Sequence, residues 1–191
     1  MMEKRVKASK LLFFIFLLCL LFILLQFTAP FMQDQNSFFD LSGSTMIIDN
    51  DNYWKELHHP WQDIYRIGDF LCHTKATRSF YLNQNQLPFC ARCTAIWLGL
   101  SVGIGLMVFF SIKNYSLFFI GFIGSVGLLG IDGVGQLLGL WESTNLIRFI
   151  TGIIVGIFTG IAIGLIFEEI QKYEKIKKIE NKVMLWCGRK R

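Results

Sequence analysis

The sequence predicts an all-α membrane protein, a bundle of four transmembrane helices with a polar region outside the bilayer. Apolar residues make up 53% of the 191 residues and charged residues only 17%, whereas about 25% of an ordinary soluble domain is charged. Four long apolar runs, at 11–25, 94–112, 117–140 and 147–167, contain almost no charge. This composition excludes a disordered chain and argues against a small soluble enzyme.

The last three runs are long enough to cross a bilayer, because a spanning helix needs about 20 residues. Their linkers, 113–116 and 141–146, are short, so we expect three antiparallel neighbours that form a core over 94–167. Small residues four positions apart share one helix face and let two backbones approach closely. This spacing occurs in all three runs: Gly99 and Gly103, then Gly135 and Gly139, then Gly152, Gly156, Gly160 and Gly164. We therefore expect the last helix to be the central packing element.

The first apolar run follows a basic segment, as in a cleaved signal peptide or an uncleaved signal anchor. Residues 26–31 offer no good small-x-small cleavage site, and Leu18 is too bulky to precede a lipoprotein cysteine at Cys19. We therefore interpret 1–29 as a signal anchor that forms the first transmembrane helix.

Positive charge is concentrated at the two ends of a chain whose formal net charge is +5. Lys and Arg are enriched in cytoplasmic segments of membrane proteins, so both termini are predicted to be cytoplasmic and 30–93 extracytoplasmic. The tail 168–191 alternates basic, acidic and apolar residues. It is interpreted as a basic amphipathic helix on the inner membrane surface or as a solvated helix. Because the basic ends flank apolar runs, membrane orientation explains them better than nucleic-acid binding.

The polar segment 30–93 contains one stretch with helical periodicity. Aromatic and aliphatic residues recur at steps of three and four between Trp54 and Leu71. Such a face lies either at the membrane–water boundary, where Trp and Tyr are enriched, or against the rest of the protein.

Three cysteines and a histidine form the strongest chemical pattern. Cys72-His73 precedes a Cys90-x-x-Cys93 motif, and three thiolates with one imidazole make a common tetrahedral Zn²⁺ set. The alternatives are a structural disulfide, incidental thiols, or redox chemistry by Cys90 and Cys93, since a helix N-terminus favours thiolate attack. Four-helix membrane thiol oxidases have a similar outline, although no second CxxC pair is present.

A set of polar residues in or near the apolar runs forms a second candidate site. Asp132 is the only acidic residue inside a run, and a charge in lipid is usually paired or functional. We predict Arg148 as its partner, in either a structural clamp or a ligand or proton site. The candidate ligand-binding residues are Arg78, Arg92, Asp132, Gln136, Glu142, Asn145 and Arg148. By topology they open toward the same side as the cysteines, so the two sets are candidates for one site.

These motifs together resemble a family of bacterial and archaeal predicted membrane proteins of unknown function. The resemblance covers about 72–156 and is carried by these residues: Cys72-His73, Arg78-Ser79-Phe80, Pro88-Phe89-Cys90-Ala91-Arg92-Cys93-Thr94, Asp132-Gly133, Gln136, Glu142-Ser143, Asn145, Arg148 and Gly152. Ala95 departs from the glycine expected after this cysteine motif. The resemblance implies a multi-pass protein of a prokaryotic plasma membrane and implies no established reaction.

The leading hypothesis from the sequence is a zinc-binding Cys/His loop above a polar cavity that binds or transports a small polar ligand or a lipid headgroup. The second hypothesis is a membrane thiol–disulfide oxidoreductase that uses Cys90 and Cys93. The third is an accessory subunit whose glycine faces dock on a membrane partner or on a second copy.

Overall fold

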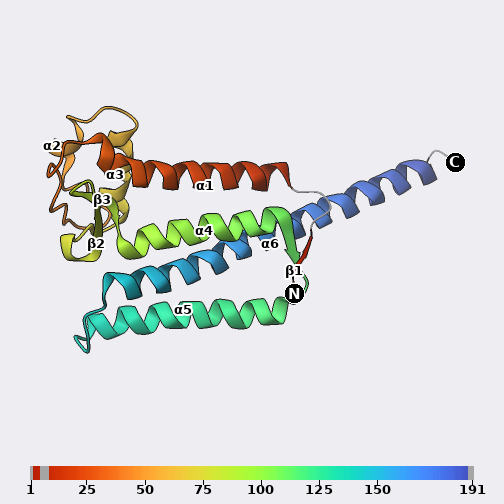
Figure 1. Cartoon of the computed structure of the whole chain (residues 1–191). Coiled ribbons are helices and arrows are strands. Elements are labelled where there is room, and N and C mark those ends of the chain that lie inside the picture. Colours follow the sequence, from red (N-terminus) through yellow and green to blue (C-terminus); the bar gives the residue numbers. More distant parts are fainter. Residues whose placement is uncertain (1, 5–8, 189–191) are drawn as a thin grey trace.

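The computed structural model describes residues 2–4 and 9–188 and is dominated by helices (Figure 1). Among these residues, four helices are long and apolar enough to cross a membrane: α1 (Lys10–Thr28), α4 (Ala91–Phe109), α5 (Tyr115–Leu137) and α6 (Asn145–Gly188). The prediction of a four-span helical protein is confirmed. The predicted basic ends lie partly outside the described residues, namely at Arg5, Lys7, Arg189, Lys190 and Arg191.

Local capping explains where three of these helices begin. The Ser9 Oγ accepts a hydrogen bond from the Leu12 N–H at the start of α1, at 3.3 Å. Asn114 caps α5 in the same way, through Oδ1 and the Leu117 N–H at 3.1 Å. At the start of α6 the Thr144 Oγ1 accepts from the Ile147 N–H at 3.3 Å. Each cap satisfies one of the N–H groups that a helix start leaves without a backbone partner.

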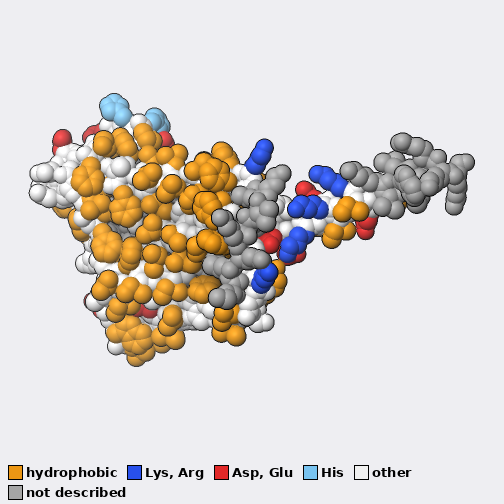
Figure 2. Space-filling model, turned by 45° about the vertical axis from the view of Figure 1, so that its right-hand side comes forward, with side chains coloured by type: hydrophobic (Ala, Val, Ile, Leu, Met, Phe, Trp, Pro, Cys, Tyr) orange, Lys and Arg blue, Asp and Glu red, His pale blue; other side chains and the backbone are white. Residues whose placement is uncertain are grey.

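The helices alternate in direction, so one end of the bundle carries the end of α1, the start of α4, the end of α5 and the start of α6 (Figure 1). The polar segment lies at this end. Figure 2 shows a broad apolar face over the bundle, with the Lys and Arg side chains gathered toward the opposite end and along the projecting part of α6. This separation of apolar and basic surface is expected of a protein that sits in a bilayer.

Glycine permits the closest helix pair, α4 with α6. A Cβ added at Gly103 would lie 2.2 Å from the Ile157 carbonyl oxygen, and one at Gly160 would lie 2.4 Å from the Leu100 carbonyl oxygen. No side chain fits at such distances, so the predicted role of the glycines in α4 and α6 is confirmed. Gly135 and Gly139 do not form such a face, because Gly135 faces the Trp141 ring and Gly139 has a φ of 70° in the turn after α5.

A hydrophobic core near the other end of the bundle joins all four helices. Its buried members are Leu12, Ile104, Met107, Val108, Phe118 and Ile161, with Phe16, Phe122 and Phe158 packed around them. Most of α5 nevertheless exposes its apolar side chains, as a helix facing lipid does.

The polar segment forms a compact subdomain with its own core. It contains η1 (Ala29–Met32), α2 (Asp51–Trp54), α3 (Trp61–Leu71) and η2 (Ala76–Arg78). The rings of Trp54 and Tyr65 stack with centroids 5.0 Å apart, and each residue is only 1% exposed. The apolar face predicted between Trp54 and Leu71 therefore packs against the protein, and it is divided between two helices.

A β-hairpin completes the subdomain and departs from the all-α prediction. Strands β2 (Ser79–Leu82) and β3 (Asn85–Cys90) pair antiparallel through a turn at Asn83 and Gln84, which both have positive φ. The buried amides of Asn85 and Gln86 accept hydrogen bonds from the Phe38 and Leu41 N–H groups. The long loop before α2 is thereby tied to β3, which leads directly into α4. A second short pair joins β1 (Met2–Lys4) to β4 (Phe110–Ile112).

The C-terminal tail is a continuation of α6. This helix is 44 residues long and runs past residue 168 without a break, projecting beyond the bundle (Figure 1). Ile170, Tyr173, Ile176 and Ile179 are exposed along it, next to its lysines. The predicted helical conformation is found, but the helix does not turn to form a separate element.

Candidate functional site

Three cysteines meet where the subdomain joins the bundle. Cys72 follows the last turn of α3, Cys90 ends β3 and precedes α4, and Cys93 lies in the first turn of α4. Their sulfur atoms all lie within 4.8 Å of one another, and all three cysteines are free thiols.

A close approach of β3 to α3 brings Cys72 to the CxxC motif. A Cβ added at Gly68 would lie 2.0 Å from the Pro88 carbonyl oxygen, so only glycine permits this contact. The Cys90 N–H then donates a hydrogen bond to the Cys72 Sγ, at 3.4 Å. Backbone N–H donors to sulfur stabilise thiolate character, which a metal ligand requires.

The cysteine thiols at this site differ in their pKa values. Hydrogen bonds from Cys72 and then Cys93 lower the pKa of the Cys90 thiol, assisted by backbone N–H groups at the start of α4. The hydrogen bond to Cys90 raises the pKa of Cys72 to about 11. Without a cation, this group of sulfur atoms therefore favours one thiolate over three.

The donor set fits a thiophilic metal ion. Zinc binds thiolate at about 2.3 Å in tetrahedral geometry, which places ligand sulfur atoms about 3.8 Å apart. The three sulfur atoms lie within 4.8 Å of one another, so their separations differ from this value by at most about 1 Å on the long side. His73 is outside this group in the structure. Its backbone carbonyl accepts a hydrogen bond from the Gly43 N–H at 3.0 Å, and its exposed side chain lines the adjacent cavity.

That cavity, of about 310 Å³, contains residues of both predicted sets. Its walls contain the three cysteines and three arginines, which come from five different elements and loops. The lining residues are Thr45, Leu71, Cys72, His73, Lys75, Arg78, Cys90, Arg92, Cys93 and Arg148. The cysteines and three of the predicted ligand-binding residues, Arg78, Arg92 and Arg148, therefore line one cavity, whereas Asp132, Gln136, Glu142 and Asn145 are not in its lining.

The structure corrects the predicted partner of Asp132. Its carboxylate pairs with Arg92, at the start of α4, and not with Arg148. Gln136 connects the two arginines, because its Nε2 donates to Asp132 Oδ2 at 3.0 Å and its Oε1 accepts from Arg148 Nη2 at 3.0 Å. Arg148 is therefore coupled to Asp132 only through a neutral amide.

The hydrogen-bonded chain continues from the bundle into the subdomain. Arg148 Nη1 donates to Asn145 Oδ1 at 3.0 Å, and Asn145 Nδ2 donates to the Ser79 carbonyl at 3.2 Å. The ring of Phe80 also packs edge-on against Phe149. Glu142 is exposed, and it takes no part in this chain of described residues.

Sequence reasoning overlooked three residues of the cavity, the apolar Leu71 and the polar Thr45 and Lys75. Lys75 lies only three residues after Cys72, so its closeness to this cysteine in the sequence is a signal that could have identified it. Thr45 carries no such signal, because a loop far from the motif in sequence brings it there.

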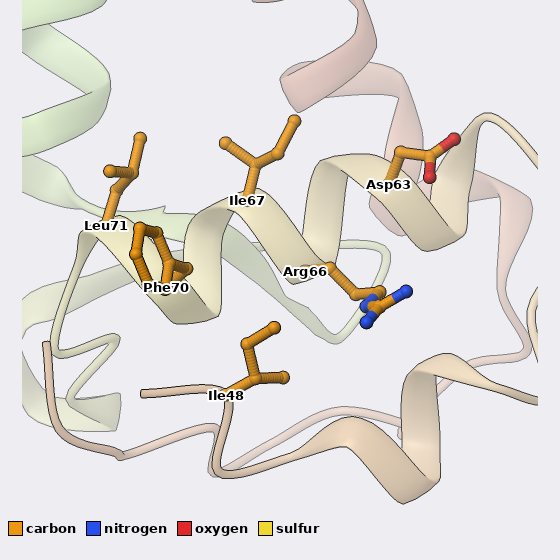
Figure 3. A pocket seen from close by; sticks show the side chains of 6 residues that line it. All are labelled: Ile48, Asp63, Arg66, Ile67, Phe70 and Leu71. Carbon is orange, nitrogen blue, oxygen red and sulfur yellow. The ribbon is translucent and has the colours of Figure 1, made fainter. Parts of the chain in front are cut away.

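A second and larger hollow lies along the exposed face of α3 (Figure 3). It measures about 600 Å³ and is lined by Ile48, Asp63, Arg66, Ile67, Phe70 and Leu71. Its charged groups are occupied elsewhere, since Arg66 pairs with Asp51 at 3.5 Å and Asp63 with His59 at 2.6 Å. With no convergent polar groups, this groove is a weaker candidate than the cysteine cavity.

A family model described as "Predicted membrane protein (DUF2085)" matches residues 72–181, from Cys72 to the projecting part of α6. The uncharacterized protein MJ1492 of Methanocaldococcus jannaschii is 34% identical over 132 residues, which cover 66% of this chain and 80% of the relative. An uncharacterized protein of Methanothermobacter thermautotrophicus is 34% identical over 94 residues, which cover 49% of this chain and 83% of the relative.

No solved structure matches the chain. The residues that match the family model make up more than half of the sequence, and they include all the cysteines and arginines of the cavity. The chain belongs to the DUF2085 family of predicted membrane proteins.

Proposed function

We propose that this protein is a zinc-dependent membrane receptor for a small polar ligand or a lipid headgroup. Zinc is held by Cys72, Cys90 and Cys93, and the ligand binds in the cavity beside them. The observation that carries the proposal is the meeting of three free sulfur atoms, within 4.8 Å of one another, at the wall of a cavity rich in arginine.

The metal has a structural role in this proposal. Its three ligands belong to the end of α3, the end of β3 and the first turn of α4, so one ion ties the subdomain to the bundle. It also keeps three thiolates ionised together, because a metal ion deprotonates the thiols that it binds. The fourth position is open to the cavity, where His73 or a bound ligand completes the tetrahedron.

Metal analysis of the purified protein tests this proposal. We expect about one Zn²⁺ per chain in detergent solution, because Zn²⁺ prefers four ligands of this kind. Cys90→Ser and Cys93→Ser should each release the metal, whereas Cys19→Ser, in the middle of α1, should retain it. His73→Ala should lower zinc affinity only if the imidazole is the fourth ligand. Metal-free protein with a quantitative disulfide among these cysteines would reject the zinc site.

That outcome would favour the redox alternative, a thiol–disulfide oxidoreductase. One observation supports it: Cys90 precedes α4, and its pKa is lowered by neighbouring thiols and backbone N–H groups, which are properties of attacking thiols. The zinc proposal is preferred because a third cysteine, Cys72, lies within reach of both.

We further propose a plasma-membrane location with both termini in the cytoplasm and the cysteine cavity outside. Lys10 and Lys113 lie at the end of the bundle opposite the cavity, together with the basic part of α6 (Figure 1). The excess of Lys and Arg at that end supports its cytoplasmic location, because these residues are enriched in cytoplasmic segments.

Labelling of intact cells with a membrane-impermeant maleimide should decide the orientation. Single cysteines introduced at the exposed residues Ser44 and Glu142 are expected to react from outside. Cysteines at Lys113 and Lys178 are expected to react only after permeabilisation. The reverse pattern would place the cavity in the cytoplasm.

A further inference from the structure

We propose that the cavity beside the cysteines is a phosphate-binding site, with Arg78 and Arg148 as its main anion-binding groups. This inference rests on the proposed function, since it names the chemical class of the cavity ligand. The class includes free phosphate and the phosphate group of an anionic lipid.

The charge of the cavity wall points to an anion. Among the described residues that line it are Lys75, Arg78, Arg92 and Arg148, and none is Asp or Glu. Asp132 compensates one of these charges by pairing with Arg92. A zinc ion bound by three thiolates carries one net negative charge. The wall and the metal together therefore retain an excess of about two positive charges.

Among the basic residues of the cavity wall, Arg148 has the least compensated charge. It is 4% exposed, and its two described hydrogen bonds go to neutral amide oxygens of Gln136 and Asn145. Its Nε is buried without a partner. Burial and then the charges of Arg78 and Arg92 act against its positive charge, and the attraction of the Asp132 and Glu142 carboxylates is smaller than each of these effects. A buried cation in this situation is stabilised by an anion in the cavity that it lines.

The charge and shape favour phosphate over a carboxylate. A phosphomonoester carries about −1.5 to −2 charge at neutral pH, which matches the positive excess, and has three oxygen atoms that accept hydrogen bonds. Guanidinium groups bind such oxygen atoms in a bidentate manner, so arginines from different elements can share one phosphate. Arg78 belongs to η2 and Arg148 to α6, and both line the cavity.

The volume limits what accompanies the phosphate. A cavity of about 310 Å³ holds a phosphate with a small substituent, not a whole lipid. It lies where the bundle meets the polar subdomain, at the depth of lipid headgroups if the helices span the bilayer. Free phosphate and a lipid phosphate therefore share this recognition chemistry.

Binding to the zinc-loaded full-length protein tests the inference. In detergent solution, inorganic phosphate should raise the melting temperature in a saturable manner, whereas acetate at the same ionic strength should not. In nanodiscs, phosphatidic acid mixed into phosphatidylcholine is compared with phosphatidylcholine alone. Stabilisation by inorganic phosphate alone identifies a soluble phosphate compound as the ligand. Stabilisation by phosphatidic acid, with or without competition by inorganic phosphate, identifies a lipid.

Arg78→Gln is the decisive variant, because Arg78 is half-buried at the cavity and lies in η2, outside the four bundle helices. It should weaken phosphate or phosphatidic acid binding about tenfold or more, as expected for loss of a charge-assisted hydrogen bond. The matched control Arg66→Gln, in the α3 groove, should bind as the wild type does. If neither phosphate source stabilises the zinc-loaded protein, or if Arg78→Gln binds normally, the phosphate site is rejected. Zinc content measured on the same samples shows separately whether the three cysteines bind zinc.

Discussion

Replacing Gly156 with leucine is expected to destabilise the folded bundle by about 3 kcal/mol or more, because overpacked backbone contacts cannot relax easily. A Cβ at this position would lie 2.3 Å from the Ile96 carbonyl oxygen and 3.0 Å from the Gly99 Cα. Helices α4 and α6 would have to separate along their whole contact. Thermal unfolding in detergent, with size-exclusion chromatography for aggregation, measures the loss.

Gly127→Leu is the matched control for this substitution. Gly127 lies in α5 and is exposed, and a Cβ added there meets no atom within 4 Å. Its substitution should leave the melting temperature nearly unchanged. Equal melting temperatures for the two leucine variants would show that α4 and α6 do not pack through their glycines.

The second large effect is expected at the ion pair between Arg92 and Asp132. Asp132→Asn keeps the shape and the hydrogen bond with Gln136 but leaves the Arg92 guanidinium without its carboxylate. Removing one partner of a buried pair costs about 3–5 kcal/mol. The side chain of Arg92 is 24% exposed, so the lower part of this range is expected.

A double-mutant cycle identifies the true partner of Asp132. Asp132→Asn combined with Arg92→Gln should recover much of the stability, because both charges are then removed. Asp132→Asn combined with Arg148→Gln should show little recovery, since Arg148 contacts Asp132 only through Gln136. Recovery with Arg148 instead of Arg92 would contradict the structure and favour the pairing predicted from the sequence.

The local patterns of the sequence determined the membrane part of this protein. A run of apolar residues defines a spanning helix by its length alone, because lipid offers no partners for the backbone and forces the segment to bond within itself. The glycine spacing of α4 and α6 likewise predicted their contact, since both the period of a helix and the size of glycine are local properties. The CxxC spacing placed Cys90 and Cys93 together for the same reason.

Local patterns predicted the polar segment less well. The turn residues Asn83 and Gln84 are not the usual glycine-containing pair, so the hairpin was not expected. The helix predicted between Trp54 and Leu71 is interrupted before Trp61, and its apolar face is buried at Trp54, Ile64 and Tyr65 but exposed at Leu71. The tail, which was predicted as a separate amphipathic or solvated helix, instead continues α6, because charged residues continue a helix as readily as apolar ones.

Only the tertiary structure decided which residues share the site. Arg148 was predicted as the partner of Asp132, whereas the structure pairs Asp132 in α5 with Arg92 at the start of α4. Gly68 lets β3 approach α3, and this contact brings Cys72 to the CxxC motif while His73 remains at the cavity wall. Such choices depend on distances between segments far apart in the chain. A period of three, four or two residues carries no information about those distances, because it describes only the neighbours along one element.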